Sequence, residues 1–282
     1  MGKITLEEIV DQVNDLPALP HVVGKIIQLT EDPDATAQDI NKVLNQDQGM
    51  TAKVLRLANS AFYGFPRRIS SITDATIFLG FRTVRGIVMA ASVSDLLSEE
   101  MEGYALAQGE LWRHSQSVAM ASRCVAQYSK FIGMDVAYTA GLLHDIGKVI
   151  LNTYMKEAYK EVIDKAAADD IPFMQAEQDI LGFNHAQIGA RVAEKWNLPE
   201  DLVEAIAYHH QPEQAVKNKK LTAIVHIADA ICLMMGIGMG VDGMLYPLSS
   251  ESMQLLNLDE LAIEQIISNM TDLLADEETF AV

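Results

Sequence analysis

Histidine and aspartate residues that could bind a metal recur along this chain after residue 98. His144 and Asp145 are adjacent in the stretch GLLHDIGK, which ends at Lys148. Asp229 lies in the apolar stretch HIADAIC, where an unpaired carboxylate would be costly to bury. The other histidines of this part of the chain are His114, His185, His209, His210 and His226. Imidazole nitrogens and carboxylate oxygens together suit Zn, Mn, Fe or Ni, so the set predicts a transition-metal site.

Taken one at a time, these histidines also have an ordinary interpretation. A single histidine at a helix end is more often a capping or surface residue than a ligand. Adjacent His209 and His210 would point about 100° apart on a helix, so both can reach one site only if the helix end is irregular. His226 lies one turn before Asp229; it could be a partner of that carboxylate, but we favour a packing role. His21 lies far from the cluster in sequence and is interpreted as a surface residue without a role.

The segments that carry these residues have the apolar spacing of helices. No stretch alternates apolar and polar residues with a period of two for long enough to form a strand, so the sequence predicts an all-α protein. Beyond residue 98, helices are predicted over 111–127, 137–144, 156–168, 173–181, 185–196, 200–210, 221–235 and 258–274. Side chains from several helices of a bundle can converge on a metal in its interior, which is the arrangement that this cluster requires.

The first part of the chain predicts a separate bundle of five or six helices. A capping-box pattern begins at Thr5, and Thr36 and Asp47 are the predicted N-caps of two short helices. A helix is also predicted from residue 73 to 80, and a longer one from there to about residue 97. The polar, glycine-containing stretch 98–110 then marks a boundary. The predicted domains are an N-terminal helical bundle over residues 1–98 and a metal-site domain over residues 99–282.

Charge is distributed unevenly along this chain, whose formal net charge is −18. The acidic balance disfavours a general affinity for nucleic acid or for an anionic membrane, since both need a positive surface. Residues 51–90 are the exception, because they carry six basic residues and one acid. Part of that segment, which we call the basic strip, is expected to dock an acidic protein partner or a small phosphate-bearing ligand; it consists of Arg67, Arg68, Arg82 and Arg85. The alternative is a set of ordinary solvated helix faces.

Nothing in the sequence points to a membrane or to secretion. The apolar segments are too short for a membrane span, and the N-terminal stretch has no apolar signal core. The sequence therefore predicts a cytoplasmic protein. Its two cysteines, Cys124 and Cys232, lie in apolar helical patterns and are interpreted as buried thiols. The predicted helix 258–274 has one apolar side, which could pack on the protein's own core or pair two chains as a homodimer.

The motifs and their order resemble a known superfamily. GLLHDIGK, with the helical His114 before it and Asp229 after it, looks like the H…HD…D pattern of the HD superfamily of metal-dependent phosphohydrolases. The stretch from LPALPHVVGKII to RTVRGIVMA closely resembles the HDOD domain, an HD-related output module of bacterial signalling proteins. GFNHAQIGARVAEKWNLPEDLVEAIAYHHQPE continues this resemblance, which covers about residues 16–233.

The resemblance implies a role for each residue of the cluster. The residues that match the H…HD…D ligands are His114, His144, Asp145 and Asp229. Asp145 would bridge the ions if a second metal is present. The residues that match the additional histidines of the related HD-GYP phosphodiesterases are His185, His209 and His210, and Lys148 matches a lysine that contacts substrate phosphate there. After the His-His pair this sequence reads QPEQAVKN, without the DGxGYP segment, which argues against hydrolysis of cyclic dinucleotides.

Two functions of different classes follow. The favoured one is a regulatory HDOD protein of bacterial signal transduction, in which the metal site is kept without turnover. The alternative is an active phosphohydrolase or phosphodiesterase acting on a phosphate ester or nucleotide, with Asp145 and Lys148 as catalytic residues. One or two divalent ions would then make water a nucleophile at neutral pH. The intact ligand set favours an enzyme, whereas the acidic character of the metal-site half opposes a polyanionic substrate.

Overall fold

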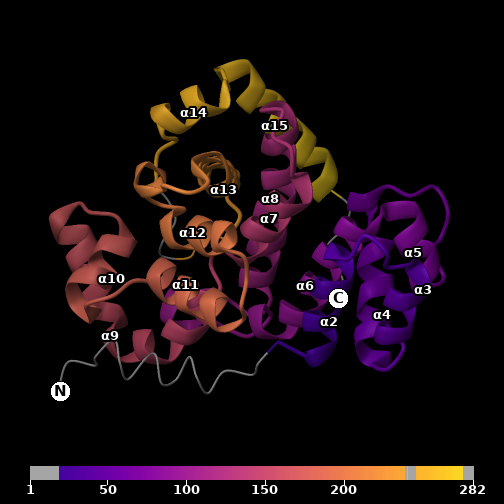
Figure 1. The fold of residues 1–282 in the computed structure, drawn as a ribbon. Helices are drawn as coiled ribbons and strands as arrows, with labels where there is room; N and C mark the ends of the chain where they lie inside the picture. Colours follow the sequence, from indigo (N-terminus) through magenta and orange to yellow (C-terminus); the bar gives the residue numbers. More distant parts are fainter. Residues whose placement is uncertain (1–18, 239, 241–245, 276–282) are drawn as a thin grey trace. The chain divides into compact units, whose positions relative to one another are not determined.

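The computed structural model describes residues 19–238, 240 and 246–275 of this chain. Within these residues the secondary structure is helical, apart from an isolated bridge between Met101 and Leu106 (Figure 1). The predicted all-α class is therefore confirmed. The capping box predicted at Thr5 lies outside the described residues. None of the described helices has both the length and the apolar character that a membrane span requires.

The chain forms two compact units, of which the smaller contains Pro17–Asp95 and the larger contains Leu96–Ile267. The predicted division after residue 98 stays a prediction. The helices that begin in the smaller unit are α2 (His21–Glu31), α3 (Ala37–Leu44), α4 (Gln48–Ala58), η1 (Ala61–Tyr63), α5 (Ile72–Leu79) and α6 (Phe81–Leu97). Both predicted caps are present, since the Thr36 backbone N–H donates to the Asp39 carboxylate and the Asp47 carboxylate accepts from the backbone N–H of Met50.

The larger unit carries the predicted metal site. Its helices are η2 (Glu102–Tyr104), α7 (Glu110–Tyr128), α8 (Met134–Leu143), α9 (Gly147–Asp169), α10 (Phe173–Leu181), α11 (His185–Lys195), α12 (Glu200–Tyr208), η3 (Pro212–Gln214), α13 (Lys219–Met234), α14 (Ser250–Leu256) and the start of α15 (Glu260–Leu274). Each helix predicted beyond residue 98 has a counterpart here, but α9 begins at Gly147 instead of residue 156. The short α14 was not predicted, although Ser249 caps it by accepting from the backbone N–H of Ser252.

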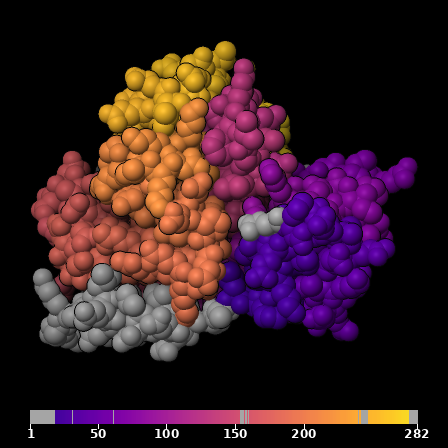
Figure 2. Space-filling model, in the orientation of Figure 1, coloured from indigo at the N-terminus to yellow at the C-terminus, as the bar shows by residue number. Residues whose placement is uncertain are grey.

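Helices of the larger unit pack around a buried apolar core. Helix α7 packs against α8 and α13, and α11 packs against α9 and α12. Their facing side chains are apolar and fully buried, for example Val118 on α7, Ile188 on α11 and Ile227 on α13. On the face shown in Figure 2, side chains of α11, α12 and α13 form a continuous surface.

Glycines allow two of these helix pairs to approach backbone to backbone. A Cβ atom on Gly141 of α8 would lie 2.7 Å from the carbonyl oxygen of Val118 on α7. A Cβ atom on Gly147, the first residue of α9, would lie 2.6 Å from the backbone nitrogen of Gly189 on α11 and closer still to the carbonyl oxygen of His185. Real Cβ contacts are longer, so these two positions require glycine. The turn that carries His144 and Asp145 lies between them and is fixed from both sides.

Candidate metal centre

The seven residues predicted to bind metal meet inside the larger unit. His114 comes from α7, His144 and Asp145 from the turn between α8 and α9, His185 from the start of α11, His209 and His210 from the turn after α12, and Asp229 from α13. The side chain of His210 has 3% of its surface exposed, and the other six residues are also buried. Polar side chains from distant parts of the sequence thus converge within the apolar bundle.

One group of these side chains surrounds the space between Asp145 and Asp229. The Nε2 atom of His114 lies 3.2 Å from Oδ1 of Asp229 and 3.5 Å from Oδ2 of Asp145. The Nε2 atom of His144 lies 3.6 Å and 3.4 Å from the same two oxygens. Ligand atoms of His114, His144 and Asp229 all lie within 4.8 Å of one another, a spacing that a single ion can bridge.

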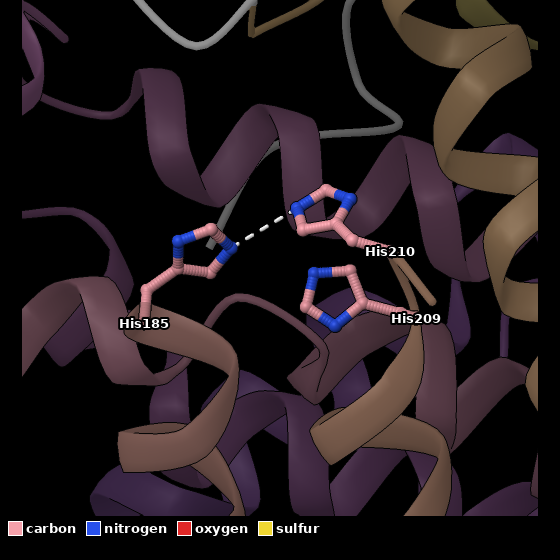
Figure 3. A group of neighbouring side chains, drawn as sticks. All are labelled: His185, His209 and His210. Atoms are coloured by element: carbon pink, nitrogen blue, oxygen red, sulfur yellow. Dashed lines mark hydrogen bonds between the residues drawn. The ribbon is translucent and has the colours of Figure 1, made fainter. Parts of the chain in front are cut away.

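A second group lies on the other side of Asp145 and consists of His185, His209 and His210 (Figure 3). The Nε2 atoms of His185 and His210 are 3.0 Å apart. Oδ1 of Asp145 lies 3.6 Å from Nε2 of His185 and 3.8 Å from Nε2 of His209. Because α12 ends at Tyr208, His209 and His210 lie in a turn, and both rings reach this centre. Asp145 thus turns one oxygen toward each group.

Hydrogen bonds fix the orientation of four of these imidazole rings. The Nδ1 atoms of His144 and His209 lie 2.7 Å from the carbonyl oxygens of Gly141 and Ile206, and Nδ1 of His114 lies 3.1 Å from that of Ile237. Nδ1 of His185 lies 2.7 Å from the carboxylate of Glu177. An Nδ1–H that donates to such an acceptor leaves Nε2 with a free lone pair, which is the tautomer that a metal ligand needs.

Several polar atoms at the centre have no hydrogen-bond partner within the described part of the chain. They are Nε2 of His144, Nε2 of His209, Nδ1 of His210 and Oδ1 of Asp145. A buried acceptor that is left unpaired costs about 1–3 kcal/mol. These four atoms lie around one space and can each donate an electron pair, so a single bound cation could provide the missing partner for several of them. The residues present therefore fit a divalent transition metal, in one or in both groups.

The electrostatics of the cluster also favour a bound cation. Burial raises the pKa of Asp145 and Asp229, but Lys148 and His144 beside Asp145, and the His114 and His144 rings beside Asp229, hold the pKa of each well below its usual range. Burial disfavours protonation of His144, but the Asp145 and Asp229 carboxylates outweigh it and raise its pKa to about 10. Burial, reinforced by His144 and His185, lowers the pKa of His209 to about 3. The two ionised carboxylates thus need positive charge beside them. Protonated histidines can supply only part of it, because His144 is readily protonated and His209 is not.

Lys148 contributes the fixed positive charge of this region. Its Nζ atom lies 2.7 Å from Oδ2 of Asp145, and the residue is 4% exposed. The same ammonium group lies 5.6 Å from the centre of the Tyr104 ring, within the range of a cation–π contact. In this structure Lys148 therefore pairs with the Asp145 carboxylate, while its predicted contact with substrate phosphate stays a prediction.

Sequence reasoning missed three residues around the centre. Glu177 is fully buried and accepts from His185, and Tyr104 donates to Glu177. Tyr246 stacks on the ring of His210, with the ring centres 3.9 Å apart and the planes inclined by 10°. Glu177 lies in a polar stretch, AEQD, Tyr104 lies in the predicted boundary 98–110, and Tyr246 lies outside every predicted helix. No pattern of the sequence distinguished them from surface residues.

The remaining two histidines lie outside the ligand set. His226 has its Nδ1 atom 2.8 Å from the carbonyl oxygen of His209, and its Nε2 atom accepts from the backbone N–H of Ser249. His226 therefore fixes the turn that carries His209 and His210. This hydrogen-bonding role is additional to the packing role that the sequence favoured. His21 is exposed and belongs to the smaller unit.

The centre is enclosed on the side of His210. Tyr246 covers the His210 ring, and the backbone N–H of Met174 donates to the Tyr246 hydroxyl oxygen, which holds the ring in place. A cavity of about 570 Å³ is lined by both His210 and Tyr246 and so reaches the cluster at His210. Gly238 closes another side, because a Cβ atom there would contact the ring of His114. An ion at the centre would be surrounded mainly by protein.

The basic strip belongs to the smaller unit. Arg67, Arg68 and Arg82 are exposed, and Arg85 is half-buried. Two exposed apolar residues accompany them, since Ile77 has 63% of its surface exposed and Phe78 has 51%. The Phe78 ring stacks on Phe65, with ring centres 4.7 Å apart. The arginines of the strip thus lie close in sequence to an exposed aromatic pair, and the strip's predicted role in docking stays a prediction.

Comparison with known proteins places this architecture in a family. Residues 16–212 match the family described as HDOD domain. A solved structure of an HDOD domain protein with unknown function from Geobacter sulfurreducens has a TM-score of 0.79 and is 29% identical, with 99% of this chain and 100% of that chain covered. The family match and this likeness agree with the resemblance seen in the sequence.

Curated relatives match parts of longer proteins. An uncharacterized protein of Treponema pallidum is 26% identical over 223 residues, which are 78% of this chain and 43% of the relative. Ribonuclease Y of Mycoplasma mycoides is 32% identical over 120 residues, which are 42% of this chain and 21% of the relative. The chain thus spans less than half the length of the curated relatives it matches.

Proposed function

The chain belongs to the HDOD family, and from this premise we propose that it is a regulatory protein of signal transduction whose larger unit holds an enclosed HD-type metal centre. The family relation supports the regulatory class, because the resemblance to HDOD implies an output module. The described site supports the metal centre, because seven candidate ligands converge on one space. In this proposal the protein binds a metal ion but does not use it to turn over a substrate.

The enclosure of a complete ligand set is the observation that carries this proposal. Catalytic metal sites keep a coordination position open to substrate, whereas structural sites are filled by protein. Here the ligand side chains are buried, and Tyr246 lies flat on His210. Oriented imidazoles would hold the ion, and Asp145 and Asp229 would balance its charge. The paired Lys148 would keep the bridging carboxylate ionised.

The second candidate is an active phosphohydrolase or phosphodiesterase. The intact ligand set favours it, and so does the likeness to Ribonuclease Y, whose name states an activity on RNA. A divalent ion supplies Lewis acidity that polarises a phosphate ester. For this function Tyr246 would have to leave the His210 ring, so that the cavity lined by both residues could admit a substrate to the centre.

Metal content and a substrate panel test the two candidates. Protein purified without added metal is expected to contain a stoichiometric transition metal, measured by inductively coupled plasma mass spectrometry. With Mn²⁺ or Fe²⁺ supplied, we expect background rates on phosphomonoesters, nucleotides, cyclic nucleotides and a single-stranded RNA. Turnover above background that His144→Ala abolishes would establish the enzyme instead. Absence of metal from the wild type and from His144→Ala alike would remove the metal centre and both candidates.

We also propose that the basic strip serves as the output surface for an acidic partner. Its exposed arginines would meet carboxylates, and exposed Phe78 and Ile77 offer anchoring points for an apolar side chain. The strip stands out in a chain whose net charge is −18, so an acidic partner would be directed to it and repelled elsewhere.

Charge reversal tests the strip. A labelled peptide rich in Glu and Phe is expected to bind the wild type in a salt-sensitive manner, as measured by fluorescence anisotropy. Arg67→Glu with Arg68→Glu is expected to weaken this binding by about tenfold or more, because two favourable charge contacts become repulsive. The matched control is Lys219→Glu with Lys220→Glu, an adjacent exposed basic pair of the larger unit. Equal losses in both variants would show a general effect of net charge and contradict docking at the strip.

A further inference from the structure

Glu177 is a buried carboxylate that touches the metal centre through a single ligand. It lies on α10 and has no exposed surface. Its Oε2 atom accepts from the backbone N–H of His185 at 3.0 Å and lies 2.7 Å from Nδ1 of the same residue. Burying a carboxylate is costly unless it is well bonded, so these contacts must offset a large desolvation cost.

The position of His185 in its helix explains why it needs such a partner. His144 and His209 follow the C-terminal ends of α8 and α12, where unpaired carbonyl oxygens are available, and each ring reaches the carbonyl three residues before it. His185 is the first residue of α11, and a helix start offers free N–H groups instead of carbonyls. An acceptor for its Nδ1–H therefore has to come from another element. Glu177 supplies it and also accepts one of the free N–H groups.

Tyr104 holds the second oxygen of Glu177. Its hydroxyl donates to Oε1 at 2.7 Å, and the residue is 1% exposed. Tyr104 belongs to the connecting stretch 98–110, which is fixed to α9 by Asn152: its side chain accepts from the backbone N–H of Gly103 and donates to the carbonyl of Glu100. The stretch 98–110, at the start of the larger unit, is thus joined through hydrogen bonds to a candidate metal ligand.

We propose that Glu177, held by Tyr104, is a positioning residue of the metal centre that orients His185 with Nε2 toward Asp145. The proposal rests on the metal centre proposed above and extends it to residues outside the ligand set. Carboxylates that accept from the non-ligating nitrogen of a metal-bound histidine fix its tautomer and increase its basicity. The Nε2 atom of His185 lies 3.6 Å from Oδ1 of Asp145, on the side where His209 and His210 gather.

Substitution of Glu177 by glutamine tests this role with metal affinity as the readout. Glu177→Gln keeps the side-chain shape but offers the His185 ring a neutral amide. We expect about a 10- to 100-fold weaker affinity for Zn²⁺, measured by competition with a chromogenic chelator, as found for lost carboxylate partners of metal-bound histidines. The absorption spectrum of the Co²⁺-loaded protein should change as well. Tyr104→Phe removes only the outer hydrogen bond and should show a smaller loss of affinity.

Two matched controls separate positioning from general stability. Glu204→Gln alters another buried carboxylate, which accepts from the backbone N–H groups of Val216, Lys217 and Asn218. Tyr138→Phe removes another buried tyrosine hydroxyl, which donates to Gln116. Both controls should lower the melting temperature and leave the Zn²⁺ affinity and the Co²⁺ spectrum unchanged.

The outcomes distinguish this inference from the metal centre itself. Wild-type affinity and an unchanged Co²⁺ spectrum in Glu177→Gln would overturn the inference while the centre stands. If that variant does not fold, wild-type values in Tyr104→Phe would overturn it equally. No Zn²⁺ binding by the wild type would overturn both the centre and this inference. Losses in Glu177→Gln and Tyr104→Phe that the controls do not share would establish it.

Discussion

Asp145→Ala is expected to abolish metal binding more completely than any other single substitution in this chain. Its Oδ2 atom lies within 3.5 Å of Nε2 of both His114 and His144, and its Oδ1 atom faces His185 and His209. Losing it therefore weakens both groups at once, whereas the loss of one histidine leaves the Asp145 carboxylate facing both groups. The metal content of the purified variant, measured by mass spectrometry, should fall to background.

The same substitution should destabilise the protein, because it leaves Lys148 as a buried cation without its partner. Removing one partner of a buried ion pair costs about 3–5 kcal/mol. The matched control is Asp95→Ala, since Asp95 also pairs with a lysine, Lys53, but has 83% of its side chain exposed. That variant should keep its metal and its unfolding free energy. Wild-type metal content in Asp145→Ala would contradict the bridging role.

Gly147→Ala is the second substitution for which we expect a large effect. The added Cβ atom would collide with the carbonyl oxygen of His185 and lie 2.6 Å from the nitrogen of Gly189. Both are backbone atoms, which cannot rotate away, so α9 and α11 would have to separate. We expect a loss of about 3 kcal/mol or more in the free energy of unfolding, seen as a melting temperature lower by roughly 10 °C.

Metal affinity should fall together with stability in this variant, because the displaced helices carry His185 and border Asp145. Gly24→Ala is the control, since a Cβ atom at Gly24 in α2 would meet nothing within 4 Å. That change should stabilise the protein by about 0.5–1 kcal/mol, as expected for glycine replaced by alanine inside a helix. A melting temperature of Gly147→Ala equal to that of the wild type would show that α9 and α11 do not need this close approach.

The helices and the ligand types were accessible from the sequence because both follow local rules. The spacing of apolar residues predicts α7, α11 and α13, and the capping residues Thr36 and Asp47 indicate where α3 and α4 begin. The beginning of α9 was predicted too late because it has no cap. Ile146 before it already has helical backbone angles, with φ −56° and ψ −25°, so α9 starts directly after the turn of His144 and Asp145. Without a capping residue, the sequence contains no mark of that start.

The supporting residues depend on tertiary structure and could not be predicted in the same way. Glu177 stands among polar residues of an amphipathic helix, and only the folded chain shows that its position is fully buried. From the sequence we could infer that His209 and His210 reach one site only if the helix end is irregular, but we could not predict that α12 ends at Tyr208. Such features arise from contacts between segments far apart in sequence, which no single stretch encodes.

The enclosure by Tyr246 has a consequence for how an ion would exchange with its surroundings. Since protein surrounds the centre, a bound ion would leave only when this part of the larger unit opens. Its residence time would then follow the rate of local unfolding more than the strength of the ligand bonds. The metal that the protein carries would in that case depend on which ion is available while the chain folds, and it would persist after the supply of that ion changes.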